Sequence, residues 1–377
     1  MAAVYLDCNA TTPIEPQVRD LVAYYFYEGV GNPGSRTHEF GQQASQAIQR
    51  AREQVASVVT AEPNEVLFTS GATESNNLAL LGLAPYGEKT GRKHIVSTAI
   101  EHKAVLEPLE ALEQRGFEVT LVPPDSGGVV PAASVLEAVR SDTLMVSAMH
   151  VNNETGVHQP IAEIANGLEN SEAYFHVDAA QGFGKVLKDL RSPRIDLISA
   201  SSHKIYGPAG VGALIARRRR YRRPPLTPLT YGGGQERGLR PGTLPTPLIA
   251  GFGLAAEFAE KYHETRREQC LEKQRETFKT FSTLDMQLNG NQNRMMPHVL
   301  NCSFKNVDSE ALMLKAKELV AISNGSACTS VRYEKSHVLQ AMGLPDKRVE
   351  NALRFSWCHL TPEFNLEAFK QAVSSLS

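Results

Sequence analysis

Two charged residues, Asp178 and Lys204, stand at the ends of apolar runs that are typical of buried strands. Asp178 follows His176-Val177, and Lys204 closes the polar stretch after Leu197–Ala200. In open α/β sheets, ligands bind outside the carboxyl ends of the strands. A lysine that can form a Schiff base and an acid that can pair with a pyridinium nitrogen are the groups that pyridoxal phosphate requires. Either residue alone is more often a surface lysine or a helix-capping aspartate, so the pair indicates this cofactor only beside a phosphate site.

A candidate phosphate site lies in the segment Ser70-Gly71-Ala72-Thr73-Glu74. It follows a predicted strand and opens a predicted helix, and the free N–H groups of a helix N-terminus bind phosphate well. The alternative is an ordinary turn in which Thr73 caps the helix. In combination with Asp178 and Lys204, the segment favours a cofactor-dependent enzyme.

The elements that must position these residues alternate along the first half of the chain. Runs rich in β-formers are separated by longer stretches with helical spacing, over 74–83, 104–115 and 132–140. This alternation predicts an α/β fold with a mostly parallel central sheet that is buried on both faces. The predicted strands are Glu65–Thr69, His94–Thr98, Glu118–Val122, Leu144–Met149, Tyr174–Val177, Leu197–Ala200 and Gly212–Ile215.

The pattern changes after residue 255. A long charged helix is predicted over Ala255–Phe281, followed by a strand over Val299–Phe304, a helix over Ser309–Leu319 and a C-terminal helix after Thr361. We therefore expect a large cofactor-binding domain over 13–255. A smaller α+β domain over 256–377, to which residues 1–12 return, is expected to carry the loop around Cys328.

Composition limits the classes of function that need to be considered. The chain has 377 residues, of which 42% are hydrophobic and 21% charged, and this excludes a disordered or collagen-like protein. Its net charge of −2 provides no electrostatic basis for binding nucleic acid or an anionic membrane. There is no run of about 18 apolar residues and no secretory signal pattern, so the expected compartment is the cytoplasm.

Five cysteines are present, at positions 8, 270, 302, 328 and 358, and no two of them form a CxxC pair. Their spacing therefore predicts neither a zinc nor an iron–sulfur cluster, and we expect no metal site. A disulfide scaffold is equally unexpected in a chain of this size. Most free cysteines are buried small hydrophobes, so each thiol must be judged from its neighbours.

Ten motifs in order along the chain are similar to those of the cysteine desulfurases of the NifS/IscS-like group, within the class V aminotransferase family. This resemblance implies a fold-type I transferase that depends on pyridoxal 5'-phosphate. The motifs are YLDCNATTP (5–13), GNPGSRTHEFG (31–41), FTSGATESNN (68–77), EHKAV (101–105), MHVNNETG (149–156), HVDAAQ (176–181), SSHKIYGPAGVGAL (201–214), GGGQERGLRPGT (232–243), SNGSACTS (323–330) and LRFS (353–356).

The resemblance also implies a role for individual residues. Lys204 would hold the cofactor covalently, Asp178 would keep its pyridine nitrogen protonated, and His102 would stack on the ring and relay protons. The remaining assignments are Gln181 to the phenolic oxygen, Ala72, Thr73, Ser201 and His203 to the phosphate, Thr243 to the phosphate of the other subunit of a homodimer, and Arg354, Asn153 and Asn32 to the substrate. Arginine suits a carboxylate because its planar fork binds both oxygens.

Cys328 is the predicted nucleophile. Its neighbours are small residues in a Gly/Ser-rich segment, and no apolar run buries the thiol. The resemblance implies that L-cysteine becomes L-alanine while its sulfur remains on Cys328 as a persulfide, which passes to a sulfur-acceptor protein. This chemistry needs the thiolate form of Cys328.

Some features depart from the family pattern. Gln235 stands where histidine is common, Pro241 where serine is common, and Trp357-Cys358-His359 is unusual. The chain ends at Ser377, without the C-terminal extension by which housekeeping relatives dock an iron–sulfur scaffold. The resemblance therefore favours a dedicated sulfur donor, similar to the desulfurases that serve DNA phosphorothioation.

Several alternatives remain open from the sequence. The sulfur could instead serve iron–sulfur cluster assembly or tRNA thiolation, and the enzyme could be a selenocysteine lyase or an aminotransferase. A non-enzymatic nucleotide-binding or DNA-binding module is a rival of another class. The run of six arginines within 217–223 could contact phosphates, but such runs are more often solvated loops or docking faces for acidic proteins. We expect no direct nucleic-acid binding and no membrane partner.

Overall fold

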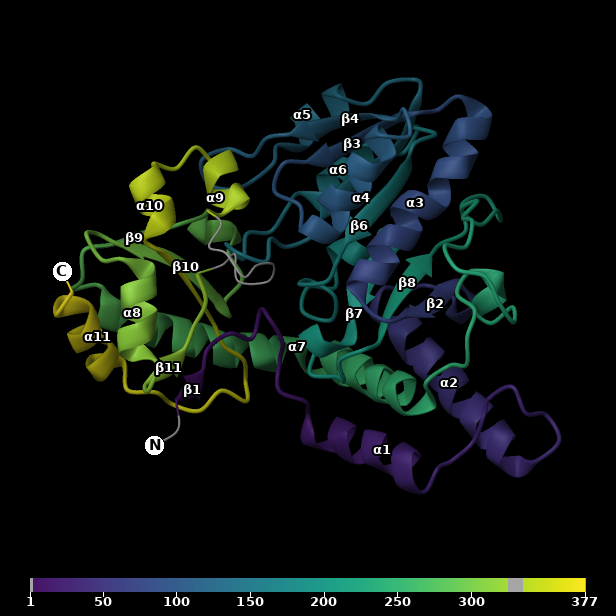
Figure 1. Cartoon of the computed structure of the whole chain (residues 1–377), viewed down its shortest axis with the longest axis horizontal. Helices are drawn as coiled ribbons and strands as arrows, with labels where there is room; N and C mark the ends of the chain where they lie inside the picture. The colour runs from purple at the N-terminus through teal and green to yellow at the C-terminus, as the bar shows by residue number, and fades with distance from the viewer. Residues whose placement is uncertain (1–2, 325–334, 377) are drawn as a thin grey trace.

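A computed structural model describes residues 3–324 and 335–376. The larger part of the molecule is built around a seven-stranded sheet (Figure 1). The strand order is β2-β8-β7-β6-β5-β3-β4, and within this sheet β8 alone runs antiparallel to its neighbours. The predicted α/β class with a mostly parallel sheet is therefore confirmed. The strands are β2 (Val66–Thr69), β3 (His94–Thr98), β4 (Glu118–Val122), β5 (Thr143–Met149), β6 (Tyr174–Asp178), β7 (Leu197–Ser201) and β8 (Gly212–Ala216).

The direction of β8 follows from its short connection to β7. Only residues 202–211 join the two strands, and they contain a single 3-10 turn, η3 (Ser202–Lys204). A parallel neighbour needs a crossover of a dozen or more residues, usually a helix. The chain therefore reverses, and the segment that reverses it carries Lys204.

Helices cover both faces of the large sheet, because successive strand residues point to opposite sides. Leu67 and Leu214 pack in one core with α3 (Ala72–Thr90) and α4 (Lys103–Glu113). Phe68 and Ile215 belong to the core on the other face. The helices of that second face are α2 (Glu39–Val58), α5 (Ala132–Glu137), α6 (Ile161–Gly167) and the first half of α7 (Thr246–Phe281).

A smaller antiparallel sheet has its own core, built around the ring of Phe281. The rings of Phe304, Phe355 and Phe369 lie 5.5–5.8 Å from it, centroid to centroid. At the start of the chain, β1 (Val4–Tyr5) pairs in parallel with β11 (Val320–Ala321) beside this core. The domain boundaries stay a prediction. The other elements of this part are β9 (Met286–Leu288), β10 (Val299–Phe304), β12 (Ala352–Ser356), α8 (Ser309–Ala316), α9 (His337–Ala341), α10 (Asp346–Glu350) and α11 (Leu366–Ser374).

The long helix α7 passes beneath both sheets and joins the two cores (Figure 1). It begins at Thr246, nine residues before the predicted start. The first turns are apolar and buried on the large sheet. The sequence pattern therefore missed them, because they lack the alternating charges of the exposed half. Beside α7 lies α1 (Pro16–Tyr27). Among the described helices, none is both long enough and apolar enough to cross a membrane.

A buried ion pair fixes the segment that leads toward Thr243. The Glu236 carboxylate accepts hydrogen bonds from Arg52 on α2 at 2.6 and 2.9 Å, and from the Phe68 backbone N–H at 2.7 Å. Both side chains of the pair are nearly inaccessible to solvent. Removal of one member leaves the other charge buried and unpaired, which typically costs about 3–5 kcal/mol.

We therefore expect Arg52→Met to lower the free energy of unfolding by about 3–5 kcal/mol in urea denaturation. The control is Arg19→Met, because the pair of Arg19 with Asp20 is exposed and such pairs contribute less than about 1 kcal/mol. Equal effects of the two substitutions would contradict the stabilising role of the Arg52–Glu236 pair.

Candidate active site

A cavity of about 340 Å³ opens at the carboxyl ends of β6 and β7, beside the N-terminus of α3. This is the edge at which ligands bind in open α/β sheets. Predicted site residues from six separate stretches of the chain meet there. The predicted site residues that line the cavity are Ala72, Thr73, His102, Asn153, Asp178, Gln181, Ser201, His203, Lys204 and Arg354.

Asp178 and Lys204 face this cavity from neighbouring strand ends. One carboxylate oxygen of Asp178 accepts from the Asn76 side-chain amide at 2.7 Å, and the other accepts from the Ala180 N–H at 2.9 Å. The Lys204 ammonium donates to the Ala10 carbonyl at 2.9 Å and to the Asn9 carbonyl. Both charged groups are thus held in position by hydrogen bonds that leave them at the cavity wall.

The opposite end of the cavity suits an anion. Gly71 precedes α3 with φ of +156°, and a Cβ at Gly212 would lie 2.6 Å from the Gly71 Cα, so only glycine permits this close approach. The side chains of Thr73, Ser201 and His203 line the same cavity as this helix N-terminus. The first N–H groups of a helix have no acceptor inside it and bind phosphate.

The two histidines of the cavity are held neutral. Burial is the main cause that lowers the pKa of His102, and Lys204 adds to it. Burial and the charge of Lys204 lower the pKa of His203 to about 4. The Nδ1 atom of His102 accepts from the Ala104 N–H at 3.0 Å. At neutral pH His102 is therefore an uncharged imidazole, which can accept a proton and return it.

Arg354 on β12 forms the wall toward the smaller sheet, and its side chain is only 1% exposed. Its guanidinium donates to the Asp7 carboxylate at 2.6 Å and to the Asn153 carbonyl at 3.0 Å. Its Nε atom is buried and has no hydrogen-bond partner. Asp7 and the Asn153 carbonyl therefore orient the guanidinium, while its Nε–H donor remains without a partner.

Sequence reasoning missed three residues of this site. Asp7 pairs with Arg354, Asn76 holds Asp178, and the Asn9 carbonyl accepts from both Gln181 and Lys204. All three lie inside motifs that the resemblance uses, YLDCNATTP and FTSGATESNN. Position in those motifs was the available signal, but their partners are 102 or more residues away and become neighbours only in the fold.

Three predicted site residues are not placed in the cavity. Asn32 and Thr243 are exposed and do not line it. Cys328, the predicted nucleophile, lies outside the described residues.

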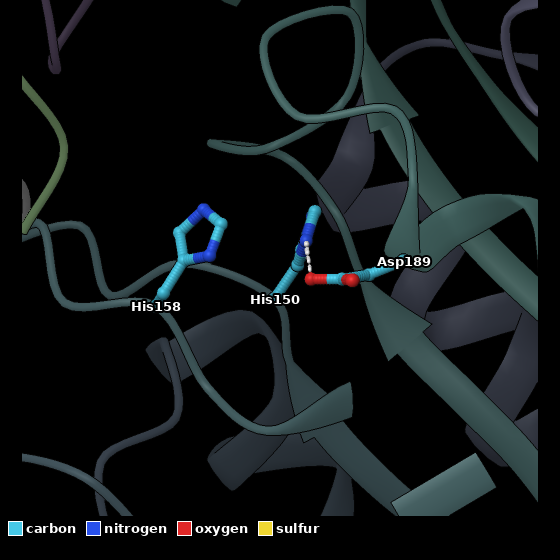
Figure 2. A group of neighbouring side chains, drawn as sticks. All are labelled: His150, His158 and Asp189. Carbon is cyan, nitrogen blue, oxygen red and sulfur yellow. Dashed lines mark ion pairs between the residues drawn. The ribbon is translucent and has the colours of Figure 1, made fainter. Parts of the chain in front are cut away.

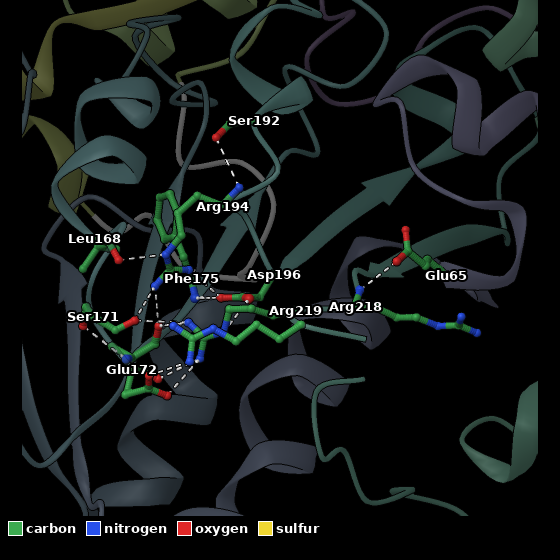
Figure 3. A network of polar contacts seen from close by, with 12 residues as sticks. Glu65, Leu168, Ser171, Glu172, Phe175, Ser192, Arg194, Asp196, Arg218 and Arg219 are labelled. Carbon is green, nitrogen blue, oxygen red and sulfur yellow. Dashed lines mark hydrogen bonds and ion pairs between the residues drawn. The ribbon is translucent and has the colours of Figure 1, made fainter. Parts of the chain in front are cut away.

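The arginine run of 217–223 divides into buried and exposed members. Arg217 is buried and donates to the carbonyls of Val59, Leu190 and Ser192. Figure 3 shows Arg219 turned into a network in which it donates to the carbonyls of residues 171–173 and lies 3.6 Å from Asp196. The members that remain exposed are Arg218, Arg220, Arg222 and Arg223.

The residues of the cavity fit pyridoxal phosphate. The donor set comprises an amine, a carboxylate, hydroxyls at a helix N-terminus and a neutral imidazole. The buried Gln181 Oε1 atom has no hydrogen-bond partner, as expected where a ligand group completes the site. Lys204 would hold the cofactor, Asp178 would face its pyridine nitrogen, and the end near Thr73 would receive its phosphate.

Comparison with known proteins supports the same assignment. The family described as Aminotransferase class-V matches residues 4–369. Cysteine desulfurase IscS of Vibrio cholerae is 44% identical over 99% of this chain and 93% of its own length. The chain belongs to the class V aminotransferases, among the cysteine desulfurases. These are sulfurtransferases that depend on pyridoxal phosphate, so the predicted cofactor and enzyme class are confirmed.

Solved structures agree on the fold-type I architecture. DndA from Streptomyces lividans is 50% identical, with a TM-score of 0.83 over 93% of this chain and 98% of its own. SspA in complex with cysteine is 36% identical, with a TM-score of 0.84 over 96% of this chain and all of its own. The predicted fold class is therefore confirmed.

A buried acid next to His102 modifies the electrostatics of this desulfurase site. Glu101 is fully buried, and this burial raises its pKa to about 8. The negative charge of nearby Asp178 also raises the pKa, whereas the hydrogen bonds to Glu101 lower it. Its Oε1 atom accepts from the Thr98 hydroxyl at 2.6 Å and the Met149 N–H at 2.7 Å. At neutral pH Glu101 is thus largely protonated, so Asp178 has no second negative charge beside it.

Because the folded state holds this proton more tightly than the unfolded chain, the resulting stability is complete below about pH 4.5 and is lost as the pH rises toward 8. We expect Glu101→Gln to abolish this contribution. As the pH rises from 5 to 8, the melting temperature of the native protein should therefore fall relative to that of the variant, as measured by calorimetry. Parallel melting curves across this range would show that Glu101 has an ordinary pKa.

Proposed function

We propose that this chain converts L-cysteine to L-alanine and retains the sulfur as a persulfide on Cys328. The observation that carries the proposal is one cavity in which Lys204, Asp178 and Arg354 meet. A covalent anchor, an acid for the cofactor and a cation for a carboxylate are together what an amino-acid enzyme of this kind needs. The relatives named cysteine desulfurase and the solved complex with cysteine support this substrate.

Arg354 binds the substrate carboxylate, because its guanidinium is already oriented by Asp7 and the Asn153 carbonyl. This contact presents the substrate Cα to Lys204, which removes the α-proton. Pyridoxal phosphate, when bound, supplies an electron sink for the negative charge that develops at the substrate carbon. Asp178 favours this by keeping the pyridine nitrogen protonated.

Sulfur transfer needs the Cys328 thiolate and a returned proton. The thiolate attacks the substrate sulfur, so that an S–S bond forms while the bond from sulfur to Cβ breaks. The three-carbon product takes up a proton and leaves as alanine, so atoms and electrons balance without an added oxidant. His102, neutral in the cavity, relays protons in these steps.

Two substitutions test these roles. We expect Cys328→Ser to keep the visible absorption of the bound cofactor and to lose alanine and persulfide formation by at least about 100-fold. Lys204→Ala should lose the absorption itself. The control is Cys270→Ser, a buried thiol remote from the proposed chemistry, which should retain both products. Release of sulfur by Cys328→Ser at the native rate would instead support a lyase.

We propose that the persulfide passes to an acceptor protein of DNA phosphorothioation. The 50% identity to DndA exceeds the 44% identity to IscS, and this difference favours the dedicated role over iron–sulfur assembly or tRNA thiolation. In the source organism, deletion of the gene should remove phosphorothioate linkages from digested DNA, as measured by mass spectrometry, and leave iron–sulfur enzyme activity intact. The reverse pattern would assign the sulfur to cluster assembly.

The four described cysteines are free and buried, which supports a reducing compartment. We therefore place the reaction in the cytoplasm. Fractionation of cells followed by activity assay would test this placement.

We also propose a homodimer with shared active sites. Asn32 and Thr243, which do not reach their own cavity, lie on segments that expose large aromatic side chains. Tyr27 and Phe40 flank Asn32, while Tyr231 precedes Thr243. These aromatic residues are 61–86% exposed, and Tyr27 and Phe40 lie at the two ends of the loop that carries Asn32. Exposed apolar side chains that form one patch typically mark a protein interface. A second copy would cover them and receive Thr243 at its phosphate site.

We expect Phe40→Glu to shift the mass measured by light scattering from dimer toward monomer. Cofactor affinity should fall in parallel, because the partner can no longer supply its hydroxyl. The control is Leu314→Glu, which changes an exposed apolar residue on the distant helix α8 and should leave the mass unchanged. A monomeric native protein with full activity would refute the shared site.

A further inference from the structure

Two histidines and an aspartate converge behind the active-site cavity, outside the proposed reaction. His150 directly follows β5, His158 follows the loop of 151–157, and Asp189 begins the 3-10 turn η2 (Asp189–Arg191). One ligand atom from each residue lies within 4.8 Å of the other two. Figure 2 shows the His150 ring between the other two side chains.

The imidazole nitrogens at this point have no hydrogen-bond partners. His150 is fully buried, and neither of its nitrogens has a partner, nor does the buried Nε2 atom of His158. The Asp189 carboxylate lies 3.6 Å from His150 Nε2, which is beyond hydrogen-bond distance. A buried polar group without a partner typically costs about 1–3 kcal/mol, so unpartnered nitrogens on two neighbouring imidazoles point to a ligand.

We propose that His150, His158 and Asp189 bind one divalent transition-metal ion such as Zn²⁺. Two imidazoles and one carboxylate are a donor set that Zn²⁺ commonly takes, with a fourth position left open. Tetrahedral coordination with bonds of about 2.0–2.2 Å places ligand atoms about 3.4 Å apart. The three side chains therefore need to close inward on binding, and partly exposed His158 and Asp189 have room to do so.

A cavity of about 660 Å³ that His158 lines provides the route to this site. Its wall also carries Lys188, Arg267 and Arg294, while Glu264 is the acidic residue among its lining. The donor set, rather than this charge, selects the ion, because Mg²⁺ and Ca²⁺ depend on oxygen ligands whereas imidazole suits transition-metal ions. The positive charge favours an anion such as chloride at the open fourth position.

A bound ion would brace the floor of the active site. The His150 backbone N–H donates to the Asp178 carbonyl at 2.8 Å, and the side chain of Asn153 lies three positions along the same loop. The metal would join this loop to η2. The site is therefore structural, and it would hold the Asp178 strand end and the substrate-side loop in register.

The test measures Zn²⁺ alone, on holoenzyme that carries Cys328→Ser so that the nucleophilic thiolate cannot bind the ion. We expect one Zn²⁺ per chain by elemental analysis after dialysis, and a visible cobalt spectrum when Co²⁺ replaces it. His158→Ala and the isosteric Asp189→Asn should each weaken Zn²⁺ binding at least about tenfold in calorimetric titration.

The matched control is His263→Ala. His263 lines the same cavity, but its Nδ1 atom is hydrogen bonded to the Glu260 carbonyl at 2.8 Å, so its loss should leave the affinity unchanged. Absence of stoichiometric Zn²⁺, or equal affinity in the native, His158→Ala and Asp189→Asn proteins, would overturn the site. Neither result bears on desulfurase activity, which is assayed separately with Cys328 intact.

Discussion

The ion pair between Asp7 and Arg354 joins the two ends of the chain at the wall of the active site. A guanidinium that is 1% exposed needs a charged partner, because an unpaired buried charge is strongly destabilising. Asp7 supplies that partner from the segment that follows β1. The pairing of β1 with β11 and of Asp7 with Ser356 keeps this segment against the smaller sheet. The N-terminal residues are therefore part of the active site as well as of the smaller sheet's surroundings.

Once this segment is in place, it also sets the position of the reactive amine. Asn9 lies two residues after Asp7, and its carbonyl accepts from Lys204 and from Gln181. Its side chain donates to the Asn153 carbonyl at 3.0 Å. One short stretch thus aligns the lysine of the large sheet with the arginine of the smaller one, across the space where the substrate would lie.

The charges of the cavity are kept few by burial. His102 and His203 are neutral near pH 7, and Glu101 holds a proton beside Asp178. Among the described residues, Lys204, Asp178, Arg354 and Asp7 carry charge at this site, each held by a hydrogen bond or ion pair. In a site of low dielectric constant, such fixed charges act more strongly on a reacting group than they would in water.

The arginine run shows why local composition alone misleads about surfaces. Six arginines in seven residues could contact phosphates or form a solvated loop, yet Arg217 and Arg219 donate to backbone carbonyls of neighbouring segments. The hairpin reverses at Arg220 and Tyr221, both with positive φ, and presents the other arginines outward. Burial of individual side chains, which periodicity cannot reveal, decides which charges a partner can meet.

The sequence by itself determined the α/β class, the strands of the large sheet, the family and most residues around the cavity. Strand periodicity is local, and the chemistry of Lys204 and Asp178 depends on their place at strand ends, which the strand pattern already contains. It did not show the apolar start of α7, the helices α1, α2 and α6, or the reversal of β8, because tertiary packing and connection length decide these. Nor could it show that Asp7, Asn9 and Asn76 hold the reactive groups, or that His150, His158 and Asp189 meet. Those contacts join distant segments, and only the folded backbone brings them together.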